Sequence, residues 1–580
     1  MAEFIRNSSL IKRKYREFFF PTIVMALSYS LTTIVDGIIV SIFLGADQMA
    51  SVNTCLPIPQ LNATIATLIG VGASTLISIS KGRRENQTAD SVFTSYFVLL
   101  ALFTVLLLGS YFVFFEPICH FLSSDKTLSP FVHSYFGMLR WGAFFHIASV
   151  SLGYVVSAEG YAKLSSASMI SANVLNLLLD ILFIRFCGMG ISGAAFASVL
   201  AFCLQFAILI VLYIFSKKRR TVHFYFKTVF KNSFSVLKTG FSASLGLILV
   251  GIKIACINKI VTNIAGPNGM IAFSLCISAL SLASLLIDGA SDTMMPILGI
   301  YHGEGDRHGV KLVFNYALKV LVFSTLALTA LLEAFPQLFF FLYKITDETT
   351  KSIALPAIRI YAISLIGVSL AFHYLYYFAG TERTLASTIV STVDGLAVIP
   401  FALLLSHFFG IYGVWFSFIA AEILSVAVIA VILLIQRKKE KKAGLKTEML
   451  LEFSFDETQI SDAIKKIRPC LTEHRIDSNS ANIVTLATEE ISVNSVEFTK
   501  KSKKKRSAIN FDITIKKTDE NIALTVCDDG SHFDPTTYKA DESAEFRIGH
   551  IELLRAMSER ISYSYVIGLN KTTVLLNEKK

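Results

Sequence analysis

The segment Gly190-Ile-Ser-Gly-Ala-Ala-Phe196 has a counterpart 220 residues later, Gly410-Ile-Tyr-Gly-Val-Trp-Phe416. A second landmark has almost the same offset, because Gly82 corresponds to Gly303 at +221. Each repeat of this length contains six long apolar runs. Since six is an even number, both repeats have the same orientation across a membrane, which is typical of transporters that rock one bundle against the other.

The composition excludes a soluble enzyme, a secreted protein and a disordered chain. Of the 580 residues, 53% are hydrophobic and only 17% are charged, whereas soluble domains carry about 25% charged residues. The chain contains twelve apolar runs, each long enough to cross roughly 30 Å of hydrocarbon. They lie at about 17–43, 52–80, 93–116, 130–157, 164–186, 191–215, 236–264, 270–300, 312–334, 352–378, 384–406 and 410–435.

The distribution of the net charge of +10 along the chain indicates which connections lie on the cytoplasmic side of the membrane. Residues 1–444 carry +12 (33 Lys and Arg against 21 Asp and Glu) and residues 445–580 carry −2 (20 against 22), which together give +10. The basic residues cluster in alternate connections, and positive residues are retained on the cytoplasmic side. We therefore expect a multi-pass protein of the cell (plasma) membrane with both termini cytoplasmic. The clusters are not expected to bind nucleic acid.

These patterns predict a polytopic all-α membrane protein of twelve transmembrane helices in two six-helix bundles, followed by a cytosolic α+β domain. The eight cysteines are scattered without a CxxC motif, so neither a disulfide framework nor a zinc site is expected. The expected parts are a first bundle (1–215), a cytoplasmic linker (216–235), a second bundle (236–436), a basic linker (437–447) and the α+β domain (448–580).

Polar side chains within the first repeat point to a cation site, because ionisable groups inside a membrane are costly and functional by default. Asp36 and Asp180 each lie eight or nine residues before the glycine that ends their run, hence roughly 12–14 Å below one surface. Asn176 shares a helix face with Asp180, and Ser198 lies at the same depth. Such oxygen ligands suit Na⁺ or a shared proton. The alternative is that each carboxyl is neutral and hydrogen-bonded between helices.

The second repeat does not duplicate this site, because Cys256 stands 220 residues after Asp36. In one interpretation, Lys253 and Asp394 form a polar pair in the second bundle, and the pairing neutralises both charges. In the other interpretation, Lys253 lines the path of the solute. Further charged residues within these runs are Lys259, Asp288, Asp292 and Glu422.

The segments 34–45, 176–180 and 193–198 resemble the first, fifth and sixth spans of multidrug and toxin extrusion (MATE) transporters. The resemblance covers about residues 10–437. It implies that the four polar residues of the first repeat bind Na⁺ or H⁺, which exchanges for an exported small organic solute. A lipid-linked oligosaccharide flippase of the same superfamily is the alternative, favoured by the lysines of the seventh run.

Residues 445–580 follow a soluble α+β pattern, and 136 residues suffice for one domain. We expect strands at 450–455, 509–515, 522–526, 561–566 and 572–576, and helices at 457–475, 478–498 and 551–560.

Two motifs in this domain favour nucleotide chemistry. Glu490 and Asn494 are spaced i, i+4, so one helix face presents a carboxylate that can polarise a hydroxyl beside an amide oxygen that can hold Mg²⁺. Asp528 follows a strand and can accept a hydrogen bond from an adenine amino group, while Gly530 permits a close turn. An Asp-Gly pair at a strand end is otherwise a plain turn.

Together with Gly549, these motifs resemble the ATP-binding domain of anti-sigma-factor serine kinases, which are short relatives of the histidine-kinase ATPases. The resemblance implies ATP and Mg²⁺ as cofactors, Glu490 as base, Asn494 as Mg²⁺ ligand and Asp528 on adenine. Phe498, His532 and Arg547 depart from the family pattern. Two roles stay open for the domain. One is a regulatory ATP-sensing module that acts with a cytosolic protein, and the other is a membrane-tethered serine kinase or signalling receptor.

Overall fold

The computed structural model describes residues 9–122, 128–215, 226–342, 347–442, 449–474, 476–501, 508–517, 521–537 and 550–577. The chain divides into two compact units. The larger unit is Tyr15–Gln436, and the smaller unit combines Met1–Lys14 with Arg437–Lys580. Each unit has hydrophobic cores of its own.

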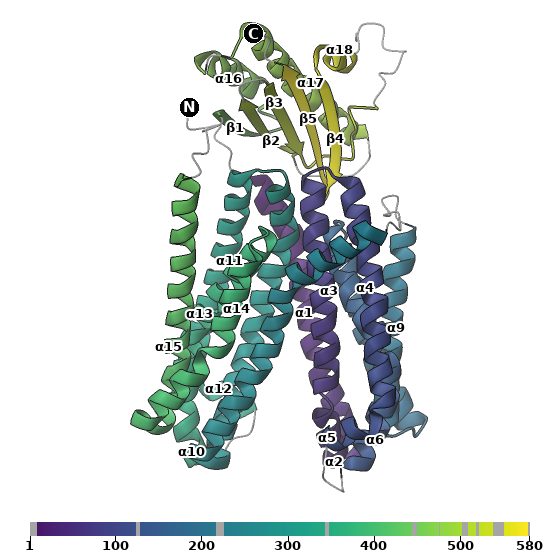
Figure 1. Ribbon diagram of the computed structural model, residues 1–580, viewed down its shortest axis with the longest axis vertical. Coiled ribbons are helices and arrows are strands. Elements are labelled where there is room, and N and C mark those ends of the chain that lie inside the picture. The colour runs from purple at the N-terminus through teal and green to yellow at the C-terminus, as the bar shows by residue number, and fades with distance from the viewer. Residues whose placement is uncertain are drawn as a thin grey trace. The chain divides into compact units, whose positions relative to one another are not determined.

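The larger unit is entirely helical in its described part (Figure 1). Its elements are α1 (Ser9–Leu44, which begins in the smaller unit), α2 (Ala46–Thr54), α3 (Pro57–Gly82), α4 (Asn86–Val113), α5 (Phe115–Leu122), α6 (Ser129–Leu139), η2 (Arg140–Gly142), α7 (Ala143–Ala158), α8 (Ala162–Asp180), η3 (Ile181–Phe186), α9 (Ile191–Ile214), α10 (Phe226–Gly303), α11 (Arg307–Ala334), α12 (Gln337–Leu342), α13 (Glu348–Gly380), α14 (Thr384–Leu396) and α15 (Val398–Lys442).

The expected number of spans is confirmed. Within the described residues, ten helical stretches are long and apolar enough to cross a membrane, and the last of them covers 384–439. This stretch is broken at Gly410, where φ is 57°, as α10 is broken at Gly266, where φ is 58°. With the two parts of 384–439 counted separately, and with the 36-residue α1 added, the spans number twelve.

Two segments expected as linkers contain helix in the structure. Helix α10 begins at Phe226, inside 216–235, and α15 continues to Lys442, inside 437–447. Lys, Arg and Glu are good helix formers, so a basic sequence at the end of a span prolongs the helix.

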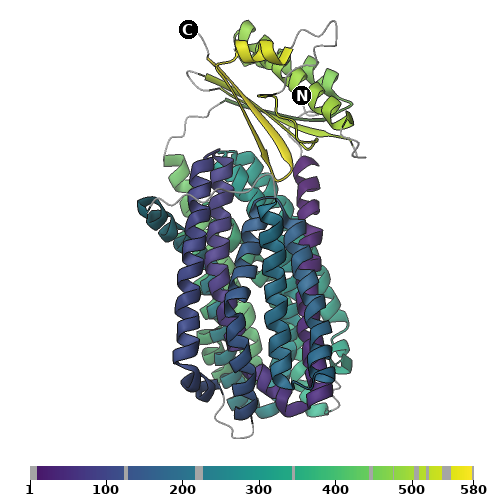
Figure 2. The ribbon, with the colours of Figure 1, turned by 90° about the vertical axis from the view of Figure 1, so that its right-hand side faces the viewer.

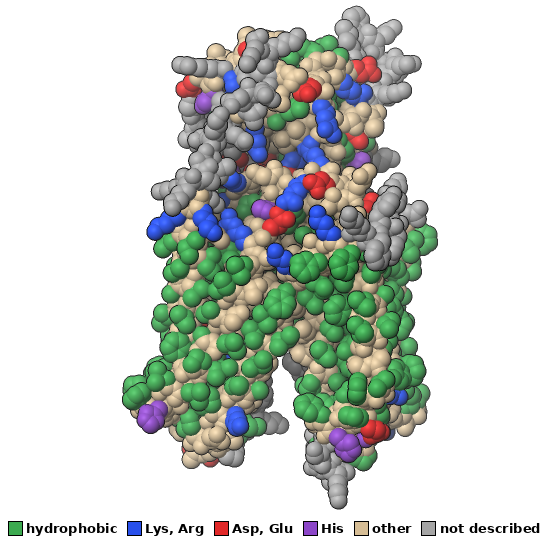
Figure 3. Space-filling view, in the orientation of Figure 1, with side chains coloured by type: hydrophobic (Ala, Val, Ile, Leu, Met, Phe, Trp, Pro, Cys, Tyr) green, Lys and Arg blue, Asp and Glu red, His purple; other side chains and the backbone are tan. Residues whose placement is uncertain are grey.

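The helices of the larger unit form two bundles with separate cores. One core is built from buried residues between Cys55 and Val236, and the other from buried residues between Ile257 and Ala421. A hollow opens between the bundles at the end that carries α2, α5, α6 and α12 (Figures 1 and 3). On the face shown in Figure 3, hydrophobic side chains cover the helices, as a lipid-facing surface requires, and Lys and Arg gather at the end opposite the hollow.

The smaller unit contains a five-stranded antiparallel sheet of order β1-β2-β3-β5-β4. Its strands are β1 (Met449–Asp456), β2 (Asn510–Lys517), β3 (Asn521–Asp528), β4 (Arg560–Val566) and β5 (Leu569–Asn577). Three helices cover one face of the sheet (Figure 2), namely α16 (Ile460–Glu473), α17 (Ser478–Lys501) and α18 (His550–Met557). The α+β fold and the order of its elements are as predicted.

The strand register determines which residues share an edge of the sheet. Phe511 of β2 is opposite Asp528 of β3, and Asp528 is opposite Asn570 of β5. One end of the sheet therefore contains the start of β2, the end of β3, the start of β5 and the end of β4. We call this end the edge that carries Asp528. The predicted adenine-binding residue, Asp528, is placed there.

Candidate functional site

Helices α1, α8 and α9 bring the four predicted cation ligands together. The carboxyl groups of Asp36 and Asp180 lie close enough to interact directly. In the amide orientation that satisfies both of its ends, Asn176 donates to both carboxylate oxygens of Asp36 at 3.1 Å. Its carbonyl oxygen then accepts from the backbone N–H of Ser198 at 3.3 Å. The arrangement agrees with the depth argument from the sequence.

This cluster suits a small cation or a proton. Two carboxyl groups in contact cannot both be ionised unless a proton or a cation lies with them. Asp180 is only 1% exposed, and its Oδ1 has no hydrogen-bond partner within the described part of the chain. A buried oxygen without a partner is costly, and a bound ion or proton would satisfy it.

The local backbone and one further side chain help to shape the cluster. Helix α8 ends at Asp180 and continues as a π-helix over Ile181–Phe186; such irregular turns are frequent at functional sites. Tyr135 of α6 lies within electrostatic range of both Asp36 and Asp180. Sequence reasoning missed Tyr135, because a tyrosine within an apolar run carries no distinguishing signal.

In the second bundle, Lys253 and Asp394 lie side by side. The Lys253 ammonium donates to the backbone carbonyl oxygen of Asp394 at 3.3 Å and lies 3.8 Å from its Oδ2. Glu422 is 7% exposed and interacts electrostatically with both residues. In the described residues, Asp394 Oδ1 and Glu422 Oε2 have no hydrogen-bond partner. One buried cation thus serves two buried carboxyl groups.

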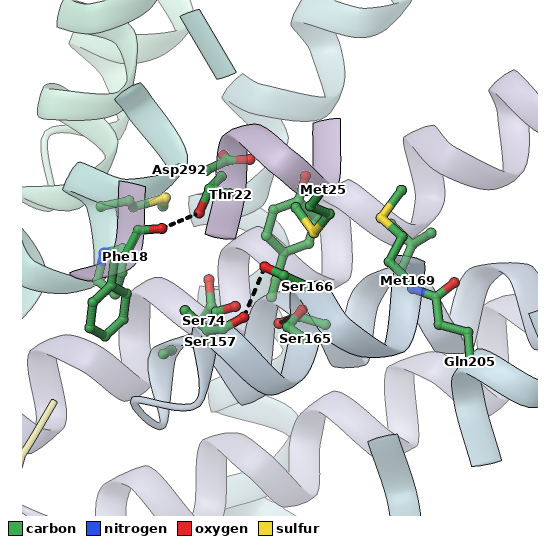
Figure 4. A pocket seen from close by; sticks show the side chains of 17 residues that line it. Phe18, Thr22, Met25, Ser74, Ser157, Ser165, Ser166, Met169, Gln205 and Asp292 are labelled. Atoms are coloured by element: carbon green, nitrogen blue, oxygen red, sulfur yellow. Dashed lines mark hydrogen bonds between the residues drawn. The ribbon is translucent and has the colours of Figure 1, made fainter. Parts of the chain in front are cut away.

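A cavity of about 150 Å³ lies among helices of both bundles (Figure 4). Helix α1 contributes Phe18, Thr22 and Met25 to its wall, α8 contributes small hydroxyl side chains, and α10 contributes Asp292. Asp292 is the carboxylate among the described lining residues. A cavity of this volume holds a molecule of about the size of benzene, and its wall mixes apolar groups with few polar ones, as in sites for small organic ligands.

In the smaller unit, Asp528 is held by three hydrogen bonds to one oxygen. Its Oδ1 accepts from the Ser495 hydroxyl, the Gly530 backbone N–H and the Asn570 side-chain amide, each at 2.8 Å. Burial raises the pKa of the Asp528 carboxyl to about 6. Since all three bonds go to Oδ1, Oδ2 is the atom left to accept from an adenine amino group.

Asn570 is a further site residue that sequence reasoning missed. Its Nδ2 also donates to the Ser531 carbonyl at 2.8 Å, and its Oδ1 accepts from the Phe533 N–H at 3.1 Å and the Tyr563 hydroxyl at 2.7 Å. Every hydrogen-bonding capacity of this amide is therefore used. The signal in the sequence was weak: asparagine is uncommon in strands, yet it is also common next to turns.

The second nucleotide motif lies on α17. The Asn494 side-chain amide donates to the Glu490 backbone carbonyl at 2.7 Å and to Glu490 Oε2 at 3.3 Å. Both side chains are partly exposed. The Asn494 amide oxygen therefore points away from these contacts, which fits a Mg²⁺ ligand. The remaining predicted residue, Gly549, lies outside the described residues.

Comparison with known families agrees with this geometry. The MatE family model matches residues 21–182 and 243–404, which is more than half of the chain. The chain belongs to the MatE family. Residues 453–575 match the histidine kinase-like ATPase domain, so this MatE protein carries an ATPase-type domain at the C-terminal end of its transporter part.

Individual relatives support the same assignment. The multidrug export protein MepA of Staphylococcus saprophyticus is 21% identical over 433 residues, which cover 73% of this chain and 93% of that protein. MepA of Staphylococcus haemolyticus is 23% identical over 409 residues, which cover 68% and 87%. A MOP superfamily transporter from Pyrococcus furiosus has a TM-score of 0.68 at 21% identity, covering 74% of this chain and 95% of that one.

An outward-facing multidrug resistance MATE family transporter of the MOP superfamily gives a TM-score of 0.68 at 21% identity, covering 75% of this chain and 97% of that one. The sequence-based resemblance to both families is thus confirmed.

Proposed function

We propose that this MatE protein exports a small organic solute across the plasma membrane in exchange for Na⁺ or H⁺, under the control of a cytosolic ATP-binding unit. The contact between Asp36 and Asp180 is the observation that carries the proposal. Ionisation of both carboxyls requires a bound cation, so the cluster exchanges either a proton or Na⁺. With both termini cytoplasmic, the hollow between the bundles faces outward.

Helix α1 links the cation site to the cavity. Asp36 lies eleven residues beyond Met25, or roughly 16 Å along the helix, and both side chains belong to α1. A cation that binds one conformation of α1 better than another shifts the balance between inward-facing and outward-facing states. Solute binding in the cavity is coupled to ion binding through the same helix.

The pairing of Lys253 with Asp394 weakens the case for a lipid-linked oligosaccharide flippase. That alternative depended on a lysine able to meet an anionic headgroup, and the Lys253 ammonium already contacts Asp394. A cationic or neutral solute therefore fits better than an anionic lipid.

In the smaller unit, ATP would be held by Asp528 at the adenine, and Mg²⁺ by Asn494. ATP would supply a ligand whose binding or turnover changes the state of the unit. Glu490 could also act as a base during transfer of the γ-phosphate of ATP to a cytosolic protein. Incorporation of labelled γ-phosphate into such a protein, measured with the same preparation, tests this role. The regulatory role requires binding only.

The test of transport uses the full chain in proteoliposomes. Asp36→Asn and Asp180→Asn are expected to abolish solute efflux driven by a Na⁺ or proton gradient, at unchanged protein incorporation. Glu348→Gln is a matched control, because the Glu348 side chain is 85% exposed. Separate Na⁺ and proton gradients identify the coupling ion. Full efflux in both variants would remove the proposed mechanism.

ATP binding is tested on the same preparation with a fluorescent ATP analogue and Mg²⁺. We expect Asp528→Asn to weaken binding at least tenfold, because it replaces an anionic acceptor by an amide. Equal affinity in wild type and variant would exclude the proposed adenine contact.

A further inference from the structure

The smaller unit contains a buried carboxylate whose cationic partner comes from the start of the chain. Asp529 is 2% exposed, and its Oδ1 accepts from the backbone N–H of Asn510 at 3.0 Å. Its Oδ2 lies 2.8 Å from the Arg13 guanidinium. Arg13 also donates to the carbonyl oxygen of Ala508 at 2.9 Å. All four residues belong to the smaller unit.

This pair makes residues 9–14, which we name the α1 head, part of the nucleotide unit. A buried carboxylate is costly unless a charge and hydrogen bonds compensate it. The match to the ATPase domain begins at residue 453, so the compensating cation lies outside the domain as its family defines it. The ATPase-type domain of this protein is therefore joined to residues that precede the first bundle.

The α1 head contacts the edge of the sheet that carries the predicted adenine site. The Lys14 ammonium lies so close to Gly568 that a Cβ there would be 2.8 Å from it. Gly568, at φ 76°, forms the turn between β4 and β5. Through Arg13 and Lys14, the head therefore contacts the start of β2, the end of β3 and the β4–β5 turn.

We propose that the Arg13–Asp529 pair couples nucleotide occupancy to α1, and thereby to the cation site at Asp36. The inference rests on the proposed ATP binding. Asp529 directly follows Asp528, so a nucleotide that repositions Asp528 also moves the carboxylate that holds Arg13. Helix α1 is continuous from Ser9 to Leu44 and therefore runs from this contact into the transporter unit.

The coupling is reciprocal, because linkage between two binding sites acts equally in both directions. Nucleotide must change the apparent affinity for the coupling cation, and the cation must change the affinity for nucleotide by the same factor. A contact that merely attached the head to the sheet would alter neither affinity.

The experiment uses the full chain in lipid nanodiscs and a fluorescent, non-hydrolysable ATP analogue with Mg²⁺. Its affinity is measured with and without the coupling cation. For wild type we expect a change of about fivefold or more, within the usual range of allosteric coupling. Arg13→Gln should still bind the analogue, but the cation should no longer change its affinity. Arg13→Lys, which keeps the charge, should retain part of the coupling.

Lys12→Gln is the matched control, because Lys12 lies in the same turn, carries the same charge and is exposed. Asp529→Asn should reproduce the effect of Arg13→Gln, and the double variant should lose no more coupling than either single one. As a separate readout, the analogue should change hydrogen exchange over residues 9–14 in wild type but not in Asp528→Asn.

The outcomes separate this inference from the proposed function. Wild-type protein that binds no analogue would overturn the proposed ATP binding, and the inference with it. Binding that the cation never affects, or full coupling in Arg13→Gln, would overturn the inference alone and leave the pair as a structural contact.

Discussion

Gly82 of α3 and Gly303 of α10 face each other across the two bundles, although they occupy equivalent positions in the two repeats. A Cβ added at Gly82 would overlap the carbonyl oxygen of Ile300, and one added at Gly303 would overlap that of Ile79. The two helix ends approach backbone to backbone, which only glycine permits. The two equivalent glycines of the repeats therefore contact each other where the bundles meet.

Alanine at either glycine should separate the helices and impair the state in which this end is closed. We expect Gly82→Ala and Gly303→Ala to lower efflux at least tenfold and to increase cysteine labelling of α3 near residue 82. Gly251→Ala is the matched control on α10, because no atom lies within 4 Å of a Cβ there. Unchanged labelling in both variants would show that the close approach has no part in closure.

An ion pair beside these glycines connects the bundles. Arg83, at the end of α3, contacts Glu382, in the turn between α13 and α14, and His302 of α10 lies 3.5 Å from the same carboxylate. Both His302 and Arg83 lower the pKa of Glu382. Arg83→Glu should weaken closure, and Arg83→Glu with Glu382→Arg should restore it. Spin labels on α3 and α13 would measure the distance between these helices. If closure is lost in the charge-swapped double variant as well as in Arg83→Glu, the charge pair has no role in it.

The second-bundle pair predicts a stability effect. Lys253→Met leaves Asp394 and Glu422 buried without their cation, a change that typically costs about 3–5 kcal/mol. Asp394→Asn in the same protein should recover most of this loss, because one carboxylate is removed. Thermal unfolding in detergent measures both. A Lys253→Met protein of normal stability that fails only in transport would assign Lys253 to the solute path instead.

The Asp528 carboxyl predicts a pH dependence of the ATPase unit. Its pKa is raised from 3.8 to about 6 in the folded protein, so the folded state favours the protonated form. The protonated carboxyl contributes up to about 3 kcal/mol to the free energy of unfolding. This contribution is fully present below pH 4 and is lost as the pH rises through about 6. Asp528→Asn should remove this loss. Hydrogen exchange of β3 and β5, compared between the two proteins at each pH, measures it; parallel profiles would contradict the prediction.

Sequence periodicity and charge were sufficient for the architecture. Twelve spans, two bundles and the α+β order could be predicted because lipid imposes long apolar runs and because strands and helices differ in period. The first-bundle cluster could also be anticipated, since Asp36 and Asp180 are conspicuous in apolar surroundings and their depth follows from helix rise.

Contacts between distant segments could not be predicted in this way. Tyr135 lies within electrostatic range of the acids from another helix, and Asn570 holds Asp528 from another strand, so neither role has a local pattern. Arg13 looked like one of several basic residues that record topology. Its pairing with Asp529 depends on three-dimensional placement, which charge counting does not supply.

The composition of the smaller unit, with residues 1–14 at one end and 437–580 at the other, has a consequence for biosynthesis. Arg13 is translated before the membrane spans, whereas its acceptor at Ala508 follows 495 residues later. Every membrane span must therefore leave the ribosome before this unit can close. A chain that stops early, or that loses a span and so reverses one terminus, leaves the head without its sheet. Closure of the unit thus occurs only after all the spans between its two parts have been translated and inserted.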